Sequence, residues 1–362
     1  MSDLENIQTL DQAQHANFIW TWKSNGRGNK ASIWIPYFDS LEKNKKLKSW
    51  VAEYNGGAVA LDLNKIDFIM FYGACGQLPL EFLDDLARHQ IPMMIHRRNV
   101  PSPYVFYPPS KSDDVDVLTT QILFRKNVIK RTYIARCLIR ERLHAMQRFL
   151  PTVDKACFKM NKCRSVAEIR NIEANASAQF WKNWFSDLEV DASRREDHPI
   201  NKALDAGSKF LFGILLRWVL FHKLSPCHGF LHEPSSYPSL PYDLMEPYRY
   251  IIERAAARVW KNGITAERQL VTETLSQIKI DLDEPVYVPA TLQLVRRKNL
   301  LHGAVLALRA YLLEQVPRLV LPVEGMRKGG RPPNCGYSIP GEIPLRKQKS
   351  PAGDELRPGA KS

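Results

Sequence analysis

The sequence predicts an α+β fold, in which a small N-terminal β-rich domain is followed by a larger all-α domain. Two observations support this prediction. Before about residue 100, short runs of β-branched and aromatic residues are separated by glycine-containing turns, which is typical of strands. After about residue 117, apolar residues recur every three or four positions, as they do in amphipathic helices. We expect domains at 1–100 and 118–324, a linker at 101–117 and a flexible basic tail at 325–362.

The first domain is expected to consist of strands and one short helix. Pro79 is suited to the first turn of a helix, so we expect a helix over residues 80–89. The strands are expected over residues 17–22, 32–37, 58–63, 66–72 and 91–95. The linker that follows contains four prolines and three aspartates, which favour turns over regular structure.

A long arginine-rich helix is expected over residues 118–150. Its arginines either form a solvated face or contact nucleic acid, and charge alone does not separate these interpretations. The apolar residues that should make this helix partly buried are Ile122, Val128, Ile129, Ile139 and Leu143.

The next helix carries the most informative acidic residue of the chain. Ser165 and Glu168 have the spacing of a capping box, and Ile169 and Ala176 follow at helical spacing. Glu173 lies on the same stripe and should therefore face inward. A buried carboxylate is costly unless it is protonated, paired or bound to a metal ion. A salt bridge to an arginine is the main alternative to a metal site.

A strongly apolar helix is expected over residues 201–221, at the centre of the core. Lys209 and Arg217 interrupt it, so it is not expected to span a membrane. The position of this helix directly before a turn-rich segment suggests that it braces that segment.

The turn-rich segment and the helix after it contain residue types that bind hard cations. His232 lies in the loop, and Asp243 and Glu246 follow at the expected start of a helix. One imidazole and several carboxylates suit Mg²⁺ or Mn²⁺ better than zinc. Simpler interpretations remain open, because Asp243 and Glu246 fit a helix capping box and His232 fits a hydrogen-bonded core histidine.

The helix that Asp243 begins is expected to continue to about residue 260, and it carries three arginines at spacings of five and four. These arginines are candidates for contact with DNA phosphates, or for ion pairs with Glu253 and other acids. The sequence leaves both interpretations open for Arg249, Arg254 and Arg258.

The overall charge bears on partners and not on the fold. The chain has 51 lysines and arginines against 38 acidic residues, which gives a formal net charge of +13 and favours a polyanion such as DNA or RNA. No apolar run approaches the roughly 20 residues of a membrane span, and no secretory hydrophobic region is seen. We therefore expect a cytoplasmic protein without a membrane partner. The six cysteines lack the paired spacing of zinc sites and are expected to be reduced thiols.

Four motifs of the second domain together resemble the CRISPR-associated integrase family, the Cas-one endonuclease of spacer acquisition. Their order and spacing are more specific than any one of them. The motifs are Asn171–Trp181 (NIEANASAQFW), Pro199–Leu204 (PINKAL), Gly229–Glu233 (GFLHE) and Asp243–Pro247 (DLMEP). The N-terminal domain resembles the family more loosely, through residues 90–95 (QIPMMI).

The resemblance implies specific roles. Glu173, His232 and Glu246 would be the catalytic ligands of a Mg²⁺ or Mn²⁺ ion, and Asp243 would be a further ligand or a partner of one. The family's fold is an N-terminal β-rich domain followed by a helical catalytic domain. Its members act as homodimers on double-stranded DNA, and a small partner protein, Cas-two, holds two dimers apart.

The sequence therefore predicts a metal-dependent DNA endonuclease and integrase of CRISPR adaptation, which joins the 3′-OH ends of short foreign DNA to a repeat array by transesterification. Two alternatives remain open. One is a casposase-type transposon integrase, and the other is a non-catalytic nucleic-acid-binding protein whose acids form caps and ion pairs. A GxxxxGKS phosphate-binding motif is absent from the sequence, so ATP is not expected to drive the reaction.

Overall fold

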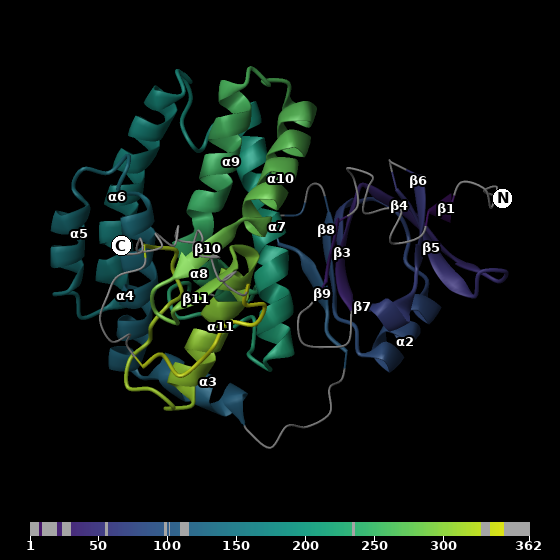
Figure 1. The fold of residues 1–362 in the computed structure, drawn as a ribbon, viewed down its shortest axis with the longest axis horizontal. Coiled ribbons are helices and arrows are strands. Elements are labelled where there is room, and N and C mark those ends of the chain that lie inside the picture. The colour runs from purple at the N-terminus through teal and green to yellow at the C-terminus, as the bar shows by residue number, and fades with distance from the viewer. Residues whose placement is uncertain are drawn as a thin grey trace, which may run out of the picture.

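The protein is described by a computed structural model, which covers residues 7–8, 20–23, 30–54, 57–97, 100, 102–108, 116–233, 236–326 and 334–343. A strand-rich N-terminal part lies beside a larger, mostly helical part (Figure 1). The α+β fold and the order of its two parts are as the sequence predicts. Most of the segment before residue 20 and all residues after 343 lie outside the described residues.

The N-terminal part contains a five-stranded sheet with the strand order β2-β3-β7-β8-β9. The three central strands are parallel, and the two edge strands are antiparallel to their neighbours. Helix α2 (Leu80–His89) connects β7 to β8, and its bounds are the ones that the sequence predicts. The strands are β2 (Trp20–Lys23), β3 (Ala31–Pro36), β7 (Ile66–Ala74), β8 (Met93–Arg97) and β9 (Tyr104–Phe106). Strand β9 lies within the predicted linker, which therefore begins with part of this sheet.

A second sheet of four strands has the order β1-β6-β5-β4. Its strands are β1 (Ile7–Gln8), β4 (Phe38–Asn44), β5 (Ser49–Tyr54) and β6 (Gly57–Leu61), and a single 3₁₀ turn, η2 (Leu63–Lys65), leads from it to β7. The sequence did not indicate β4, because its buried residues, Phe38 and Leu41, are three positions apart and the exposed Glu42 and Lys43 are consecutive, so the alternation typical of a strand is absent.

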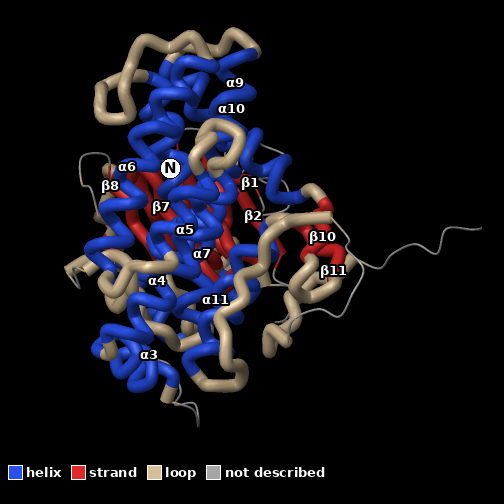
Figure 2. The backbone as a smooth tube through the Cα atoms, turned by 90° about the vertical axis from the view of Figure 1, so that its left-hand side faces the viewer, coloured by secondary structure: helices blue, strands red, loops and turns tan. Residues whose placement is uncertain are grey.

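The five-stranded sheet is buried on both faces. Along β7, Ile69 and Phe71 face the second sheet and α2, whereas Phe68 and Met70 face the helical part. Alternate residues of a strand point to opposite faces, so one strand contributes to both cores. Seen from the helical side, the helices lie over these strands (Figure 2).

The helical part is built around α7 (Pro199–Phe221), the core helix that the sequence predicts. Its Phe210 packs edge-on against Trp34 of β3, with ring centroids 4.9 Å apart. A Cβ at Gly213 would lie only 2.1 Å from the sulfur of Met70, so glycine allows the helix to approach the sheet. Within the described ranges, no helix is both long and apolar enough to cross a membrane.

The other elements of this part surround α7. The sequence predicts helices alone here, but the structure also contains two strands. A hairpin of β10 (Pro285–Val288) and β11 (Gln293–Arg296) precedes the last helix. The helices are α3 (Val117–Lys126), α4 (Val128–Ala145), α5 (Val153–Met160), α6 (Val166–Asp187), α8 (Ser239–Met245), the 3₁₀ turn η3 (Glu246–Tyr248), α9 (Arg249–Lys261), α10 (Glu267–Asp283) and α11 (Lys298–Leu312).

The single long helix predicted over 118–150 is wrong, because Asn127 divides it into α3 and α4. The Asn127 backbone is extended; its N–H donates to Leu123, and its side chain accepts from Lys130 N–H. One residue therefore ends one helix and caps the next. Val128 and Ile129, expected to be partly buried, are 64% and 82% exposed.

Part of the segment expected to be a flexible tail is instead packed. Residues 334–343 lie against the β10–β11 hairpin, where Gln293 hydrogen-bonds both the N–H and the C=O of Ile339. Ile339 is 1% exposed, and Glu342 forms an antiparallel bridge with Val295. The last nineteen residues of the predicted tail lie outside the described residues.

Candidate metal centre

Asp243 organises the candidate site. Its fully buried side chain lies inside α8, so it does not begin a helix, and the alternative interpretation of Asp243 and Glu246 as a capping box is wrong. One carboxylate oxygen accepts from the N–H groups of Phe230 and Leu231, at 2.5 and 2.8 Å. The other accepts from the N–H of His232 at 3.1 Å. Three consecutive backbone donors of the loop thus satisfy one buried carboxylate, as burial of the charge requires.

The same carboxylate orients the imidazole of His232. Nδ1 of His232 lies 2.6 Å from Oδ1 of Asp243. In the neutral ring, an Nδ1–H that donates to a carboxylate leaves the lone pair on Nε2, which is the usual arrangement of a metal-binding histidine. Burial alone would lower the pKa of His232, but Asp243, and then Glu246, outweigh it and raise that pKa above its ordinary value.

Helices α3 and α4 hold the loop from its other side through hydrogen bonds to its carbonyls. Arg125 donates to Gly229 O at 2.8 Å, and Arg131 donates to Phe230 O at 2.9 Å. Gln121 donates to the carbonyls of Ser225 and His228 and accepts from Ser225 N–H. These side chains place the loop that carries His232.

This role of the arginines could not be predicted from the sequence. The arginines of the helix predicted over residues 118–150 were expected to form a solvated face or to contact nucleic acid. Instead, Arg125 and Arg131 bind a loop about one hundred residues away along the chain. Arg125 lies one helical turn after Gln121 on α3, but Arg131 lies on α4, beyond the break at Asn127, so no single helical spacing relates the three residues.

Gly229 is required where the loop passes α8. A Cβ at this position would lie 2.7 Å from Oδ2 of Asp243 and 2.9 Å from Oγ of Ser239. The N–H of Gly229 also donates to that Ser239 hydroxyl at 3.0 Å. The glycine of the GFLHE motif therefore lets the backbone approach the buried carboxylate.

Glu246 opens the turn η3 and lies between two arginines. Its side chain is almost completely buried, with Oε1 3.0 Å from Nε of Arg249 and Oε2 3.9 Å from Nε of Arg142. Arg142 is itself buried and binds Glu253 through both terminal nitrogens, at 3.0 and 2.5 Å. The carboxylate is thus held in a network of paired charges, in which Arg142 is a residue that the sequence did not single out.

Glu173 lies on α6, whose capping box and apolar stripe form as predicted. Ser165 Oγ accepts from Glu168 N–H, and Ile169 and Ala176 are buried. Glu173 is half-buried and accepts a hydrogen bond from Ser177 at 2.6 Å. Burial alone would lower the pKa of Arg249, but Glu246, Glu253 and Glu173 raise it, so the charge of Glu173 reaches the same guanidinium as that of Glu246.

The structure thus brings some of the predicted residues together and leaves others apart. His232 and Asp243 are in direct contact, and Arg249 lies in the field of both Glu246 and Glu173. Within the part of the chain that is described, no three histidine, cysteine, aspartate or glutamate side chains are grouped closely enough to hold a metal ion. The donor types nevertheless fit Mg²⁺ or Mn²⁺, because two carboxylates accompany one imidazole nitrogen with an available lone pair.

The three arginines considered for DNA contact each have an acidic neighbour. Arg249 pairs with Glu246, Arg254 lies 3.5 Å from Glu324, and Arg258 lies 3.0 Å from Asp281. None of the three pairs with Glu253, which binds Arg142 instead. Arg254 and Arg258 keep nearly half of their side-chain surface exposed, at 44% and 47%.

Comparison with known proteins relates this chain to one family. The family model described as CRISPR associated protein Cas1 matches residues 42–281. A CRISPR-associated endonuclease Cas1 of Pyrococcus horikoshii is 27% identical over 172 residues, which are 44% of this chain and 53% of the relative. The aligned region thus spans about half the length of this curated relative.

Solved structures show the same fold. A casposase bound to integration product has a TM-score of 0.68 and 19% identity, covering 80% of this chain and 92% of that one. A CAS1 protein from Thermotoga maritima has a TM-score of 0.66 and 19% identity, covering 81% of this chain and 99% of that one. The strand-rich domain followed by a helical part is therefore shared with both.

Proposed function

Because this chain belongs to the CRISPR associated protein Cas1 family, we propose that it is a metal-dependent DNA endonuclease and integrase of CRISPR adaptation. The observation that carries the proposal is the contact between His232 and Asp243. A buried carboxylate fixes the ring so that Nε2 is available, and Glu246 lies close enough to raise the pKa of that ring. A carboxylate that accepts from the other ring nitrogen is the usual partner of a metal-binding histidine.

The proposed ligands of a Mg²⁺ or Mn²⁺ ion are Glu173, His232 and Glu246, with Asp243 orienting His232. Such an ion, when bound, activates a hydroxyl group and neutralises charge on the attacked phosphate. The protein's own contribution is to hold the donors: Asp243 and the arginines of α3 and α4 fix the loop, and η3 presents Glu246. Arg249 supplies positive charge beside Glu246, where a DNA phosphate would approach.

The proposed substrate is short double-stranded DNA whose 3′-OH ends are joined to a repeat array by transesterification. The net charge of +13 supports a nucleic-acid partner, and Arg254 and Arg258 have exposed guanidinium groups suited to phosphate contact. Solved structures of this fold include a Cas6-RT-Cas1–Cas2 complex and a TtCas1–DNA complex. We propose a homodimer that works with the small Cas-two partner in the cytoplasm.

Two other functions each have one observation in their favour. The casposase likeness, with a TM-score of 0.68, supports a transposon integrase with the same chemistry and another DNA target. The pairing of Glu246 with Arg249 supports a non-catalytic binding protein whose acids serve as ion-pair partners. Comparing a DNA target from a repeat array with one from a transposon end tests the transposon integrase. Strand transfer or DNA cleavage on either target excludes the non-catalytic binding protein.

The direct test is strand transfer by the purified full-length chain. Incubation with 3′-OH DNA and a supercoiled repeat target, in Mg²⁺ or Mn²⁺, should give joined products that a chelator abolishes. Glu173→Ala should lower the rate by at least about 100-fold, since it removes a charged ligand from the site. Glu267→Ala, which changes an exposed glutamate of α10, should leave the rate unchanged. Full activity of Glu173→Ala would refute the site assignment.

A further inference from the structure

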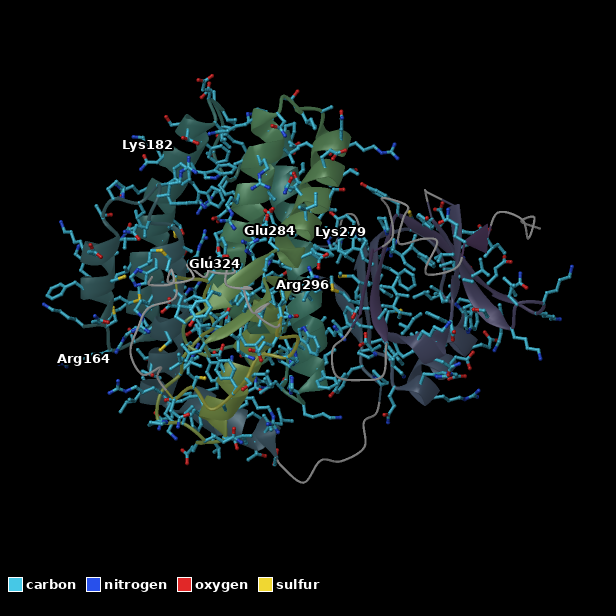
Figure 3. All side chains as sticks on the ribbon, viewed as in Figure 1. Arg164, Lys182, Lys279, Glu284, Arg296 and Glu324 are labelled. Atoms are coloured by element: carbon cyan, nitrogen blue, oxygen red, sulfur yellow. The ribbon has the colours of Figure 1, made fainter. Side chains whose placement is uncertain are left out.

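The segment that follows α11 crosses the molecule next to the proposed metal site. Residues 316–326, here called the strap, contain no helix or strand, yet Leu319, Leu321 and Pro322 are buried. The strap is pinned at its far end by Glu324, whose carboxylate accepts from Nε of Arg297 at 2.9 Å. Glu324 and Glu284, the two acids that Arg297 binds, are labelled near each other over the helical part in Figure 3, and both side chains are partly exposed.

Three tyrosines from different parts of the chain hydrogen-bond the backbone of the strap. Tyr133 of α4 accepts from the N–H of Leu319 at 3.1 Å. Tyr337, from the packed C-terminal segment, donates to the carbonyl of Val320 at 2.7 Å. Tyr248 donates to the carbonyl of Pro322 at 2.8 Å. Burial raises the pKa of Tyr248 well above its ordinary value, so its hydroxyl keeps the proton that it donates.

Tyr248 differs from the other two because it shares a turn with a proposed ligand. The 3₁₀ turn η3 consists of Glu246, Pro247 and Tyr248, and the N–H after it closes back onto the carbonyl of Glu246. Proline fixes its own backbone angle, so little freedom remains between the glutamate and the tyrosine. Whatever fixes the ring of Tyr248 therefore also limits where the backbone of Glu246 lies.

The turn η3 is buried, but its contact with the strap is incomplete on one side. A cavity of about 300 Å³ adjoins Pro247 and Tyr248 on one side and Val323 and Glu324 on the other. Among the residues with described positions, the Tyr248 hydroxyl makes the one hydrogen bond between η3 and the strap. Its loss would leave a buried carbonyl without a partner and would loosen the turn at the same time.

We propose that Tyr248 is a positioning residue for the metal site, which fixes the turn carrying Glu246 by fastening it to Pro322 of the strap. The inference rests on the proposed function, because it assumes that Glu246 is a ligand. Residues that orient a ligand without touching the metal typically change metal affinity by about 10- to 100-fold when they are replaced. Loss of the Tyr248 hydroxyl should therefore weaken metal binding even though the side chain never meets the ion.

The chain offers a matched control in Tyr337. Tyr248→Phe and Tyr337→Phe each remove one hydroxyl that donates to a carbonyl of the same strap, and the two carbonyls are two residues apart. Both should lower the melting temperature of the full chain by a similar few degrees. Only the first is connected to the turn that carries Glu246.

The readout is Mn²⁺ affinity, measured on the full chain by electron paramagnetic resonance of free Mn²⁺. We expect Tyr248→Phe to weaken binding about 10-fold, Tyr337→Phe to change it less than about twofold, and excess Mn²⁺ to restore strand transfer by Tyr248→Phe. Equal affinities of the two variants would overturn the positioning role while leaving the metal site in place. Absence of Mn²⁺ binding by the wild-type chain, or unchanged binding by Glu246→Ala, would overturn the proposed function itself and this inference with it.

Discussion

Among single residues, Asp243 shows how one buried carboxylate determines local structure. Its two oxygens accept from three successive N–H groups and face the imidazole of His232, although the two residues are eleven positions apart. A fully buried charge is tolerated only when it is surrounded by donors in this way. The loop therefore has one arrangement, and His232 has one orientation.

A second histidine, His302, makes the stability of the folded chain depend on pH. His302 is 6% exposed and stacks on Trp218 with ring centroids 3.5 Å apart. Burial, and then the charges of His222 and Arg217, lowers the pKa of His302 to about 2. The unfolded chain binds a proton there below about pH 6.5 and the folded chain does not, so stability is present above that pH and is lost as the pH falls.

We therefore expect His302 to reduce the free energy of unfolding by about 2 kcal/mol between pH 7.5 and pH 5. His302→Phe keeps an aromatic ring against Trp218 but does not titrate, so its unfolding free energy should depend less on pH by that amount. Urea unfolding at both pH values, followed by tryptophan fluorescence, measures the difference within each protein. An identical pH dependence of the two proteins would contradict the buried, neutral state of His302.

At this scale, the sequence identified the acidic and histidine residues but not their partners. Glu173, His232, Asp243 and Glu246 were found through residue type and motif spacing. Their charged partners, such as Arg142 and Arg249 beside Glu246, depend on which helices pack together. Nothing local distinguishes the buried Arg142 from the more exposed arginines of α3 and α4.

Among the secondary-structure elements, the break between α3 and α4 has the clearest local cause. Asn127 accepts from Lys130 N–H at 3.0 Å, which caps α4, while its own N–H closes α3. An asparagine side chain can cap a helix, whereas the apolar residues on both sides continue the helical spacing. The capping side chain of Asn127 predicts a break, whereas the apolar spacing predicts one continuous helix. The apolar spacing was misleading here.

Asn127→Ala should destabilise the protein by about 1 kcal/mol, because the first turn of α4 loses its cap. Asn127→Asp keeps an acceptor at the same place and should change the unfolding free energy by less than about half as much. Both variants are compared with the wild-type chain by urea unfolding. Equal destabilisation by alanine and aspartate would show that the cap is not what Asn127 contributes.

The loop that carries His232 was correctly expected to lack regular structure, but its support was not. The elements that hold it, α3 and α4, come about one hundred residues earlier in the chain. Short-range patterns report helices and turns well because these depend on neighbouring residues. Contacts between distant elements depend on how the helices pack, which one sequence does not show.

Across the whole molecule, α7 connects the two parts through a buried ion pair. Arg217 is 3% exposed and pairs with Asp67 of β7, which also accepts from the Ser32 hydroxyl at 2.9 Å. Burial is the main influence on the pKa of Arg217 and lowers it, against the opposing charge of Asp67. The pair lies where the five-stranded sheet meets the central helix.

Asp67→Ala should destabilise the protein by about 3–5 kcal/mol, because it leaves the charge of Arg217 buried without its partner. Asp197→Ala removes an ion pair with Lys202 whose side chains are 84% and 46% exposed, and it should cost less than about 1 kcal/mol. Thermal and urea unfolding of the two variants give the comparison. Similar losses from both would show that the buried pair does not connect the two parts of the fold.

The α+β class and the order of the two parts were predictable, because strand and helix patterns change clearly near residue 117. The β10–β11 hairpin and the packing of residues 334–343 were not predictable from the sequence. Glycine, proline and lysine in the latter segment suggested flexibility, yet Ile339 reaches the core between Gln293 and Gly303. Contacts with Gln293 of the hairpin and Gly303 of α11, rather than local composition, determine that these residues are packed.

The central claim is that Glu173, His232 and Glu246 bind one divalent cation. Crystals of the full chain grown with Mn²⁺ and measured for anomalous scattering test it most directly. We predict a single strong peak in contact with Nε2 of His232 and with carboxylate oxygens of Glu173 and Glu246. A peak at other residues, or none at saturating Mn²⁺, would contradict the claim.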